Sequence, residues 1–150
     1  MEQLRTKLKP LKGFDSFSDV YKSGRKFSNK TLLGSFKAKA KDDNAKLIET
    51  LYFGVSIGKK IAKRAVVRNR VKRLMRESIR QLIPKHLKEN ESCPIEFMVF
   101  SWRQKVEKPG MICLQEVLPL MDELISKAFD YFESINEAKE KNENSNIIAD

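Results

Sequence analysis

Residues 59–81 read KKIAKRAVVRNRVKRLMRESIRQ, and this stretch decides how the rest of the chain is arranged. From Ala65 onward it contains neither proline nor glycine, and its Arg, Lys, Leu, Met and Ala content favours a helix. Apolar and small side chains recur at spacings of three and four, which places them in one stripe: Val67, Val71, Leu74, Met75, Ser78 and Leu82. The stripe predicts a helix that packs against a sheet and leaves its other face outward.

The outward part of this predicted helix is strongly cationic. Residues 59–80 carry ten Lys and Arg against one acid, Glu77. Every fourth residue is a cation along one ridge beside the stripe: Arg68, Lys72, Arg76 and Arg80. Like charges at this spacing weaken an isolated helix by about 0.2–0.5 kcal/mol per pair. An ordinary solvated face mixes both signs of charge, so the ridge indicates a surface that meets a polyanion.

The composition fits one soluble domain with a core. The chain has 150 residues, of which 41% are hydrophobic and 33% charged, and its net charge is +10. The positive charge belongs to the N-terminal part and the central helix, whereas the segment from Tyr131 onward is weakly acidic. This distribution favours nucleic acid or an anionic membrane as the partner. No apolar stretch approaches the length of a membrane span, and no secretory leader pattern begins the chain, so we expect a cytoplasmic protein without membrane contact.

The remaining pattern predicts a helix, two strands, the basic helix, a strand and a final helix. The first helix covers residues 16–22 with Ser16 as its cap, and strands cover residues 26–39 and 47–57 with a polar turn at 41–46 between them. Pro84 ends or closely follows the basic helix, a strand covers residues 95–102, and the last helix covers residues 113–134. We expect a small α+β (α/β sandwich) domain over residues 1–135. Residues 1–13 form a flexible basic arm, and residues 136–150 form a disordered polar tail.

The residues do not indicate a catalytic centre. Two-metal nucleases need several carboxylates that converge on Mg²⁺, but the acids here lie in loops, on the last helix or in the tail. Cys93, Cys113 and the single His86 do not have metal-ligand spacing, and no glycine-rich phosphate loop is present. The sequence therefore predicts a binder with no catalytic residues and no metal site of its own.

Residues 58–78, GKKIAKRAVVRNRVKRLMRES, closely resemble the signature of the bacterial ribonuclease P protein component. That signature is a Lys pair, a short basic lead and then R-N-R-x-K-R-x-x-R-E on a helix. FDSFSDVYKSG at residues 14–24 is similar to the family's first helix, and YFGVSIGKK at residues 52–60 to its strand before the signature. The resemblance covers about residues 9–134.

The resemblance implies a ribosomal-protein-S5-like fold, in which a left-handed β-α-β crossover places the basic helix on a small, mainly antiparallel sheet. It implies a single RNA-binding domain over residues 1–135 that binds the catalytic RNA subunit of ribonuclease P, with one protein per RNA. The holoenzyme removes the 5′ leader of precursor tRNA, and the Mg²⁺ that this reaction needs is held mainly by the RNA.

The resemblance also assigns site residues. The RNA-facing positions are Lys59, Lys60, Arg64, Arg68, Asn69, Lys72, Arg73 and Arg76, and we add Arg70, because Arg suits bidentate phosphate contacts. A cleft for the single-stranded leader would contain Phe17, Tyr21, Lys22, Phe36 and Tyr52. The alternative is a non-catalytic basic ribosomal or nucleoid-associated protein that uses the same ridge on RNA or DNA. An autonomous nuclease is a third class, which the layout of the acids does not favour.

Overall fold

The structure is a computed structural model that describes residues 5–38, 48–87, 93–106 and 112–148. The elements follow in the order β1 (Arg5–Pro10), α1 (Phe14–Ser23), β2 (Arg25–Ser28), β3 (Leu32–Ala38), β4 (Ile48–Ile57), α2 (Ala65–His86), β5 (Ile95–Trp102) and α3 (Leu114–Ile148). The predicted turn at residues 41–46 lies outside the described residues.

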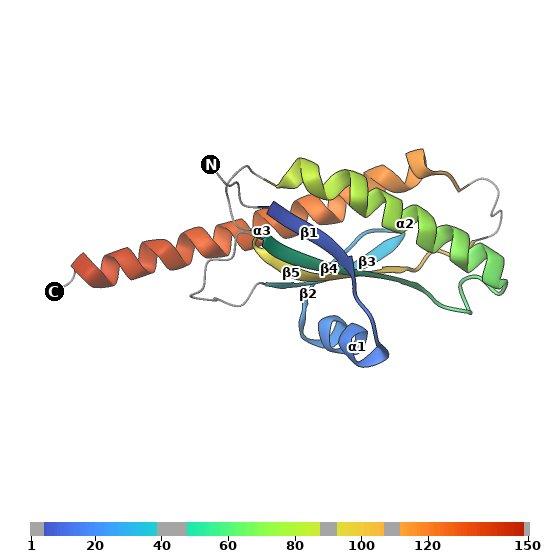
Figure 1. The fold of residues 1–150 in the computed structure, drawn as a ribbon, viewed down its shortest axis with the longest axis horizontal. Coiled ribbons are helices and arrows are strands. Elements are labelled where there is room, and N and C mark those ends of the chain that lie inside the picture. Colours follow the sequence, from blue (N-terminus) through green and yellow to red (C-terminus); the bar gives the residue numbers. More distant parts are fainter. Residues whose placement is uncertain (1–4, 39–47, 88–92, 107–111, 149–150) are drawn as a thin grey trace.

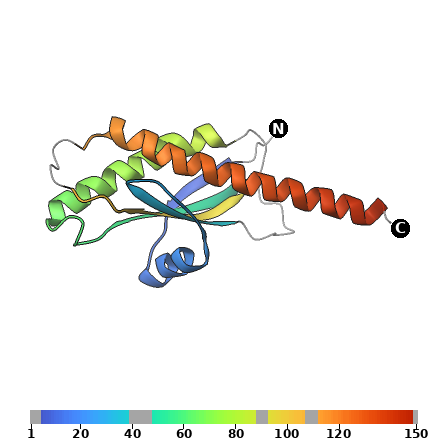
Figure 2. The same cartoon turned by 180° about the vertical axis from the view of Figure 1, so that it is seen from behind.

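The strands form one five-stranded sheet with helices on both faces, which confirms the predicted α+β sandwich. The strand order is β1-β4-β5-β3-β2. β3 is antiparallel to β2 and β5, whereas β4 is parallel to β1 and β5. Helices α2 and α3 lie side by side over one face, and α1 lies on the other (Figures 1 and 2). We call the second face the α1 face.

The predicted strand–helix–strand unit is present as β4–α2–β5. Because β4 and β5 are parallel neighbours, the chain has to cross over the sheet between them, and α2 makes that crossover. The left-handed sense of this connection stays a prediction. The unit joins the basic helix directly to the two central strands of the sheet.

The core lies between α2, α3 and the sheet. The buried side of α2 consists of Val71, Met75, Ser78, Ile79, Leu82 and Ile83, and Val67 and Leu74 are partly buried beside them. This confirms the predicted stripe. Val117, Met121, Leu124, Ile125, Ala128, Phe129 and Phe132 of α3 and the inward residues of β3, β4 and β5 complete the core. The core therefore determines which side of α2 faces outward.

Two segments that we predicted to be irregular are regular. Residues 5–10 are not a flexible arm, because β1 pairs with the outer edge of β4 over its whole length, with Arg5 opposite Ile48 and Pro10 opposite Phe53. Their alternation of Lys7 and Lys9 with the partly buried Leu8 is a strand pattern, which is easily overlooked in so short and basic a segment. Residues 136–148 are not disordered, because α3 continues to Ile148 and extends beyond the sandwich (Figures 1 and 2). They contain neither Pro nor Gly, and Glu, Ala and Lys favour helix.

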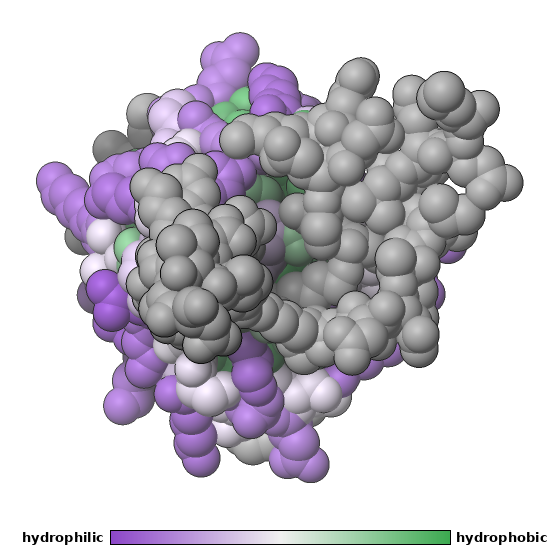
Figure 3. Space-filling model, turned by 90° about the vertical axis from the view of Figure 1, so that its left-hand side faces the viewer, coloured by the Kyte–Doolittle hydropathy of each residue, from purple (hydrophilic) through white to green (hydrophobic). Residues whose placement is uncertain are grey.

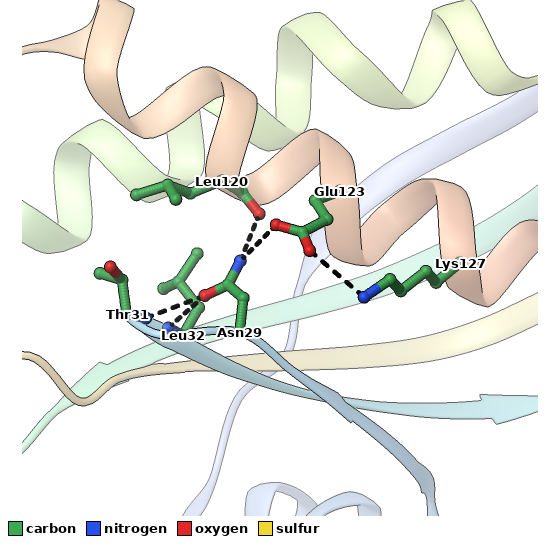
Figure 4. Close-up of polar contacts among 6 residues, drawn as sticks. All are labelled: Asn29, Thr31, Leu32, Leu120, Glu123 and Lys127. Atoms are coloured by element: carbon green, nitrogen blue, oxygen red, sulfur yellow. Dashed lines mark hydrogen bonds and ion pairs between the residues drawn. The ribbon is translucent and has the colours of Figure 1, made fainter.

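The predicted single strand over residues 26–39 is a hairpin of β2 and β3, whose turn is fastened to α3 by Asn29. The Oδ1 atom of Asn29 accepts hydrogen bonds from the backbone N–H groups of Thr31 (3.0 Å) and Leu32 (2.8 Å). Its Nδ2 atom donates to the carbonyl oxygen of Leu120 (3.1 Å) and to Glu123 (3.3 Å) (Figure 4). This contact holds the hairpin against α3.

Helix ends differ from the sequence prediction at two places. Ser16 does not cap α1, because the helix begins at Phe14 and its N-cap is Gly13, whose φ of 95° lies in the left-handed region that glycine adopts without strain. Pro84 does not end α2, which continues to His86, where the Leu87 N–H donates to the Ile83 carbonyl (3.2 Å).

On the end of the molecule from which α3 extends, the coloured surface is mostly polar along its outer edge, and apolar residues show mainly toward the middle (Figure 3). Among the described residues, no helix is both long and apolar enough to span a membrane.

Candidate nucleic-acid interface

The outward face of α2 presents the cations at the centre of the predicted site. Arg73, Arg76 and Arg80 are exposed together with Asn69, whereas Lys72 is half-buried at the edge of that face. A step of four residues advances about 40° around a helix, so the predicted ridge turns gradually from the packed side toward solvent. The ridge is therefore exposed at its C-terminal part and turns toward the core at Arg68.

Arg68 and Arg70 are already bonded to the protein. The Arg68 guanidinium donates to the carbonyl oxygens of Ala62 (2.9 Å) and Lys63 (2.7 Å) in the preceding loop. The Arg70 guanidinium donates to the carbonyl oxygen of Ile112 (3.0 Å), before α3. Both residues hold neighbouring segments of the backbone in position. They therefore shape the surface in addition to carrying positive charge.

The loop at residues 58–64 adds four exposed cations: Lys59, Lys60 and Arg64 of the predicted site, and Lys63. It is a tight turn in which the carbonyl oxygen of Gly58 accepts hydrogen bonds from the N–H groups of Ile61 (3.1 Å) and Ala62 (3.2 Å). Arg64 is the N-cap of α2 and makes no side-chain cap, and the first turn contains no acid. Because a helix N-terminus itself carries positive potential, this loop and the first turn form a region that favours anions.

These cations are not neutralised within the described part of the chain. No described carboxylate lies within 4.0 Å of the side-chain nitrogens of Lys59, Lys60, Arg64, Lys72, Arg73 or Arg76, and the one acid of α2, Glu77, lies 3.9 Å from Arg80. The six cations on α2 and its leading loop are therefore free to bind phosphate. We call them the α2 cation set.

The α1 face carries three of the four predicted aromatic residues. The half-buried Phe17 ring of α1 lies directly on Gly54 of β4, where a Cβ atom would overlap it. Val20 is buried, and its carbonyl oxygen accepts a hydrogen bond from the Ser35 hydroxyl of β3 (2.7 Å). These two contacts determine how α1 lies across the sheet.

The C-terminal half of α1 is held by charged groups. The Lys37 ammonium of β3 lies 3.0 Å from the Asp19 carboxylate. The Arg103 guanidinium donates to the Tyr21 hydroxyl (2.8 Å), and the Lys26 ammonium lies 5.3 Å from the centre of the Tyr21 ring. Tyr21 is thus half-buried between two cations, and Lys22 is exposed in the last turn of the helix.

Four of the five predicted cleft residues are accessible, and one is not. Phe17, Tyr21 and Lys22 belong to α1, and Tyr52 lies on the α1 face of β4, two residues before Gly54. Phe36 is wrong as a cleft residue, because it is fully buried on the opposite face, with its ring centre 5.4 Å from that of Phe100. Alternation along β3 requires this, since Ser35 and Lys37 on either side of it meet α1.

The structure adds residues that the sequence prediction missed. Phe97 of β5 lies opposite Tyr52, and the two rings stack with centres 5.4 Å apart and an interplanar angle of 18°. An irregularity in the β3–β5 register pairs Ala38 with Ile95 but Lys37 with Phe97, so Phe97 faces α1 although Ile95 faces the core. Arg103, next to Tyr21, was also missed. Alternation placed Phe97 on one side of its strand but could not show which side faced α1.

Histidine, cysteine and acidic side chains do not form a centre in the described residues. No group of three or more of them is arranged to hold a metal ion there. His86 Nε2 lies 2.8 Å from Asp122 Oδ1, which joins α2 to α3. Cys93 is buried and Cys113 is exposed. The donor set of the described part therefore does not fit a protein-held metal cluster.

We predict that Gly54→Ala lowers the free energy of unfolding by about 1–3 kcal/mol, because the added methyl group forces the Phe17 ring off the sheet. Urea denaturation measures this change. Gly58→Ala is the matched control, since no atom lies within 4 Å of a Cβ at Gly58. Equal stability of the two variants would contradict the close packing of Phe17 on β4.

The chain is a five-stranded α+β sandwich with an unneutralised cationic helix on one side and half-buried rings on the other. These features define a small, basic protein of the nucleic-acid-binding class. The family model described as Ribonuclease P matches residues 6–125, well over half of the chain. The chain belongs to the ribonuclease P protein family.

Individual relatives agree with this assignment. The chain is 39% identical over 80 residues to the ribonuclease P protein component of Clostridioides difficile (strain 630), covering 53% of this chain and 63% of the relative. It is 40% identical over 76 residues to that of Microcystis aeruginosa (strain NIES-843 / IAM M-2473), covering 49% and 59%. The matched segments thus span about three fifths of these curated relatives.

Solved structures share the fold. The ribonuclease P protein of Thermotoga maritima superposes with a TM-score of 0.60 at 19% identity, covering 79% of this chain and 96% of that one. The protein of Staphylococcus aureus superposes with a TM-score of 0.56 at 22% identity, covering 79% and 94%. At these identities the superpositions concern the fold alone.

Proposed function

We propose that the chain is the protein subunit of ribonuclease P. It binds the catalytic RNA subunit and the 5′ leader of precursor tRNA, and it assists the endonucleolytic step that gives the mature 5′ end of tRNA. The observation that carries this proposal is the α2 cation set, six cations without a described carboxylate partner on the helix that holds the family signature and on the loop before it. Its site of action is the cytoplasm.

The α2 cation set docks the protein on structured RNA. Lys72, Arg73 and Arg76 project from a helix whose other side is packed in the core. The other three cations lie in the hydrogen-bonded turn just before this helix, so the whole set is held in a fixed pattern. Arg73 and Arg76 provide planar donors for phosphate oxygens, and the exposed Asn69 amide, about one helical turn before Arg73, can hydrogen-bond a sugar or base edge. With five to six phosphates bound, the logarithm of affinity falls with the logarithm of salt at a slope of about −4 to −5.

The α1 face binds the single-stranded leader. Single strands expose base faces, and aromatic rings or Arg planes stack on them. Phe17 and Tyr21 are half-buried, so each ring is packed on one side and keeps an accessible surface, and Lys22, Lys26 and Arg103 supply positive charge close by. Gly54, on which Phe17 rests, lies four residues before that loop along β4.

The protein supplies binding and orientation, and the RNA supplies the chemistry. The family resemblance implies that the Mg²⁺ ions of the reaction are held mainly by the RNA. Mg²⁺ held by the RNA would supply an activated water and charge stabilisation for the leaving oxygen. One protein per RNA is sufficient, because a single copy carries both the α2 cation set and the α1 face.

Reconstitution tests the proposal. We expect this protein, added to its cognate ribonuclease P RNA at low Mg²⁺, to restore cleavage of precursor tRNA at the mature 5′ end. The protein without RNA should not cleave the same substrate at any Mg²⁺ concentration. Failure to bind the RNA, or an unchanged Mg²⁺ requirement, would refute the subunit role, and cleavage by RNA-free protein would identify a nuclease instead.

A further inference from the structure

A small cavity lies between the first two turns of α3 and the segment that follows β5. Its volume is about 220 Å³, and four apolar side chains line it: Trp102, Val106, Ile112 and Leu120. Three polar side chains complete the lining: Gln104, Lys105 and Glu116. Pockets that hold drug-sized ligands measure about 300–1,000 Å³, so this smaller space suits a single flat ring. We call it the α3 cavity.

The α3 cavity is fastened to the segments that carry the α2 cation set. The Val106 N–H donates to the carbonyl oxygen of Ile61 in the loop at residues 58–64 (3.3 Å). The Arg70 guanidinium of α2 donates to the carbonyl oxygen of Ile112 (3.0 Å). Helices α2 and α3 also lie side by side (Figures 1 and 2). The cavity therefore keeps a fixed place beside the helix and loop whose cations face outward.

The apolar part of the cavity is held in position by hydrogen bonds. Trp102 is 5% exposed, and its indole N–H donates to the carbonyl oxygen of Gln104 (2.8 Å). The carbonyl oxygen of Leu120 accepts a hydrogen bond from Asn29 (3.1 Å), which fixes this turn of α3. Because these walls are already in place, a ring that enters between them does not have to order them first.

The polar part of the lining has unused hydrogen-bonding groups. The Thr31 hydroxyl donates to Gln104 Oε1 (2.9 Å), which leaves the Nε2 amide group of Gln104 without a partner among the described residues. The Glu116 carboxylate pairs with no described cation, and Glu116 lies one helical turn before Leu120 on the same side of α3. The lining thus offers a free donor and a free acceptor.

Charge and shape select the kind of ligand. Lys105 and Glu116 carry opposite charges, so the lining has no net charge and does not favour a phosphate. An aliphatic side chain would leave the amide and the carboxylate unbonded. A nucleobase has flat faces for the apolar walls and an edge that presents both donors and acceptors. The α3 cavity therefore fits an unpaired nucleobase.

We propose that the α3 cavity binds one unpaired nucleobase of the RNA that docks on the α2 cation set. The base lies between the apolar walls, and its edge bonds to Gln104 and Glu116. This inference rests on the proposed function and deepens it, because phosphate contacts position an RNA but do not read its bases. The cavity supplies a base contact next to the phosphate-binding surface.

Filling the cavity tests the proposal. Leu120→Phe places a ring in the space that the base would occupy, so binding of the cognate ribonuclease P RNA should weaken about tenfold, as for the loss of one stacked base. The salt slope should stay that of the wild type, because no phosphate contact is lost. Filter binding across a salt series measures both quantities. Leu118→Phe, at a partly buried leucine of α3 that does not line the cavity, is the matched control and should bind RNA as the wild type does.

The direction of a second effect separates a base contact from a general effect of charge. Glu116→Ala removes a negative charge, so charge alone would tighten the binding of any RNA. If the carboxylate accepts a hydrogen bond from a base, the same change should instead weaken binding about fivefold. Asp130→Ala removes another exposed carboxylate of α3 that has no described partner, and it should not weaken binding. Because Glu116 is exposed, this test also covers the case in which Leu120→Phe folds poorly.

Trp102 reports occupation of the cavity, because it is the single tryptophan of the chain. Assembly of the wild-type protein with the cognate RNA should quench its fluorescence, and Leu120→Phe should not show this quench even at saturating RNA. The four nucleoside 5′-monophosphates, added to the protein without RNA, test a free nucleotide as the source of the base. If they quench Trp102 fully while Leu120→Phe binds RNA as the wild type does, the assignment to the docked RNA is overturned.

The outcomes distinguish this inference from the subunit role. If the wild-type protein does not bind the RNA, the proposed function fails. If it binds but Leu120→Phe and Leu118→Phe have equal affinity, or Glu116→Ala tightens binding, the cavity holds no base and the subunit role stands. Trp102 fluorescence that does not change on assembly would likewise refute the base site.

Discussion

Replacing Lys72, Arg73 and Arg76 together by alanine is expected to weaken binding of the cognate RNA by about hundredfold. Each phosphate contact contributes a slope of about 0.7 to 0.9 in log affinity against log salt, which amounts to about fivefold at physiological salt. Three contacts together give about two orders of magnitude, or about 2.8 kcal/mol. The salt slope should become shallower by about two to three. Filter binding across a salt series measures both quantities.

The same variant should fold as stably as the wild type. None of the three side chains pairs with a described carboxylate, and Lys72 and Arg76 repel each other across one helical turn. Alanine is also the best helix former. Lys30→Ala/Lys85→Ala/Lys105→Ala is the charge-matched control, because these exposed lysines lie outside the α2 cation set and remove the same charge. An equal loss of affinity in the control would show that net charge, and not the outward face of α2, binds the RNA.

Arg68 is left out of that variant for a structural reason. Its guanidinium holds the carbonyl oxygens of Ala62 and Lys63, so removing it would also release the loop that presents Lys59 and Lys60. Spacing along the helix placed Arg68 and Arg76 in the same ridge. It could not show that the preceding loop folds back within reach of Arg68. Arg70 and Ile112, which are far apart in the chain, form the same kind of contact.

The sequence was sufficient to predict an element where a local pattern of residues by itself determines which side chains are buried. The three- and four-residue spacing from Val67 to Leu82 predicted both the helix α2 and its buried side, because no other arrangement would bury those side chains together. Alternation likewise identified β4 and β5. The family resemblance then added two expectations that periodicity alone does not contain, the left-handed sense of the crossover and an RNA partner.

Sequence reasoning failed where an outcome depends on pairing between distant segments. Strand β1 exists because the outer edge of β4 has unpaired backbone groups that residues 5–10 can satisfy. The orientation of Phe97 depends on a register irregularity beside Lys37, and a pattern of alternation cannot reveal such a shift. The α1 face was consequently predicted less completely than the outward face of α2.

Variants of Phe36 test whether this ring serves the core, as the structure indicates, or binds the leader, as the sequence analysis expected. It is 0% exposed, and its ring meets those of Phe27 and Phe100 edge-on with centres 6.0 and 5.4 Å away. Phe36→Ala should therefore lower the free energy of unfolding by about 3–5 kcal/mol, a large share of the stability of an ordinary domain. Urea denaturation measures this loss, and Phe36→Leu, which leaves a smaller cavity, should cost less.

The affinity of folded Phe36 variants for the leader should not decrease along with their free energy of unfolding. Phe36 lies on the α2 and α3 side of the sheet, so Phe36→Leu, which stays folded, should bind a long-leader precursor tRNA as the wild type does. Phe17→Leu should show the reverse pattern, with a smaller loss of stability and a clear loss of leader affinity, because its half-buried ring lies on the α1 face. If both leucine variants lost leader affinity equally, the leader would depend on the packing of the whole sheet, and the assignment of its site to the α1 face would be wrong.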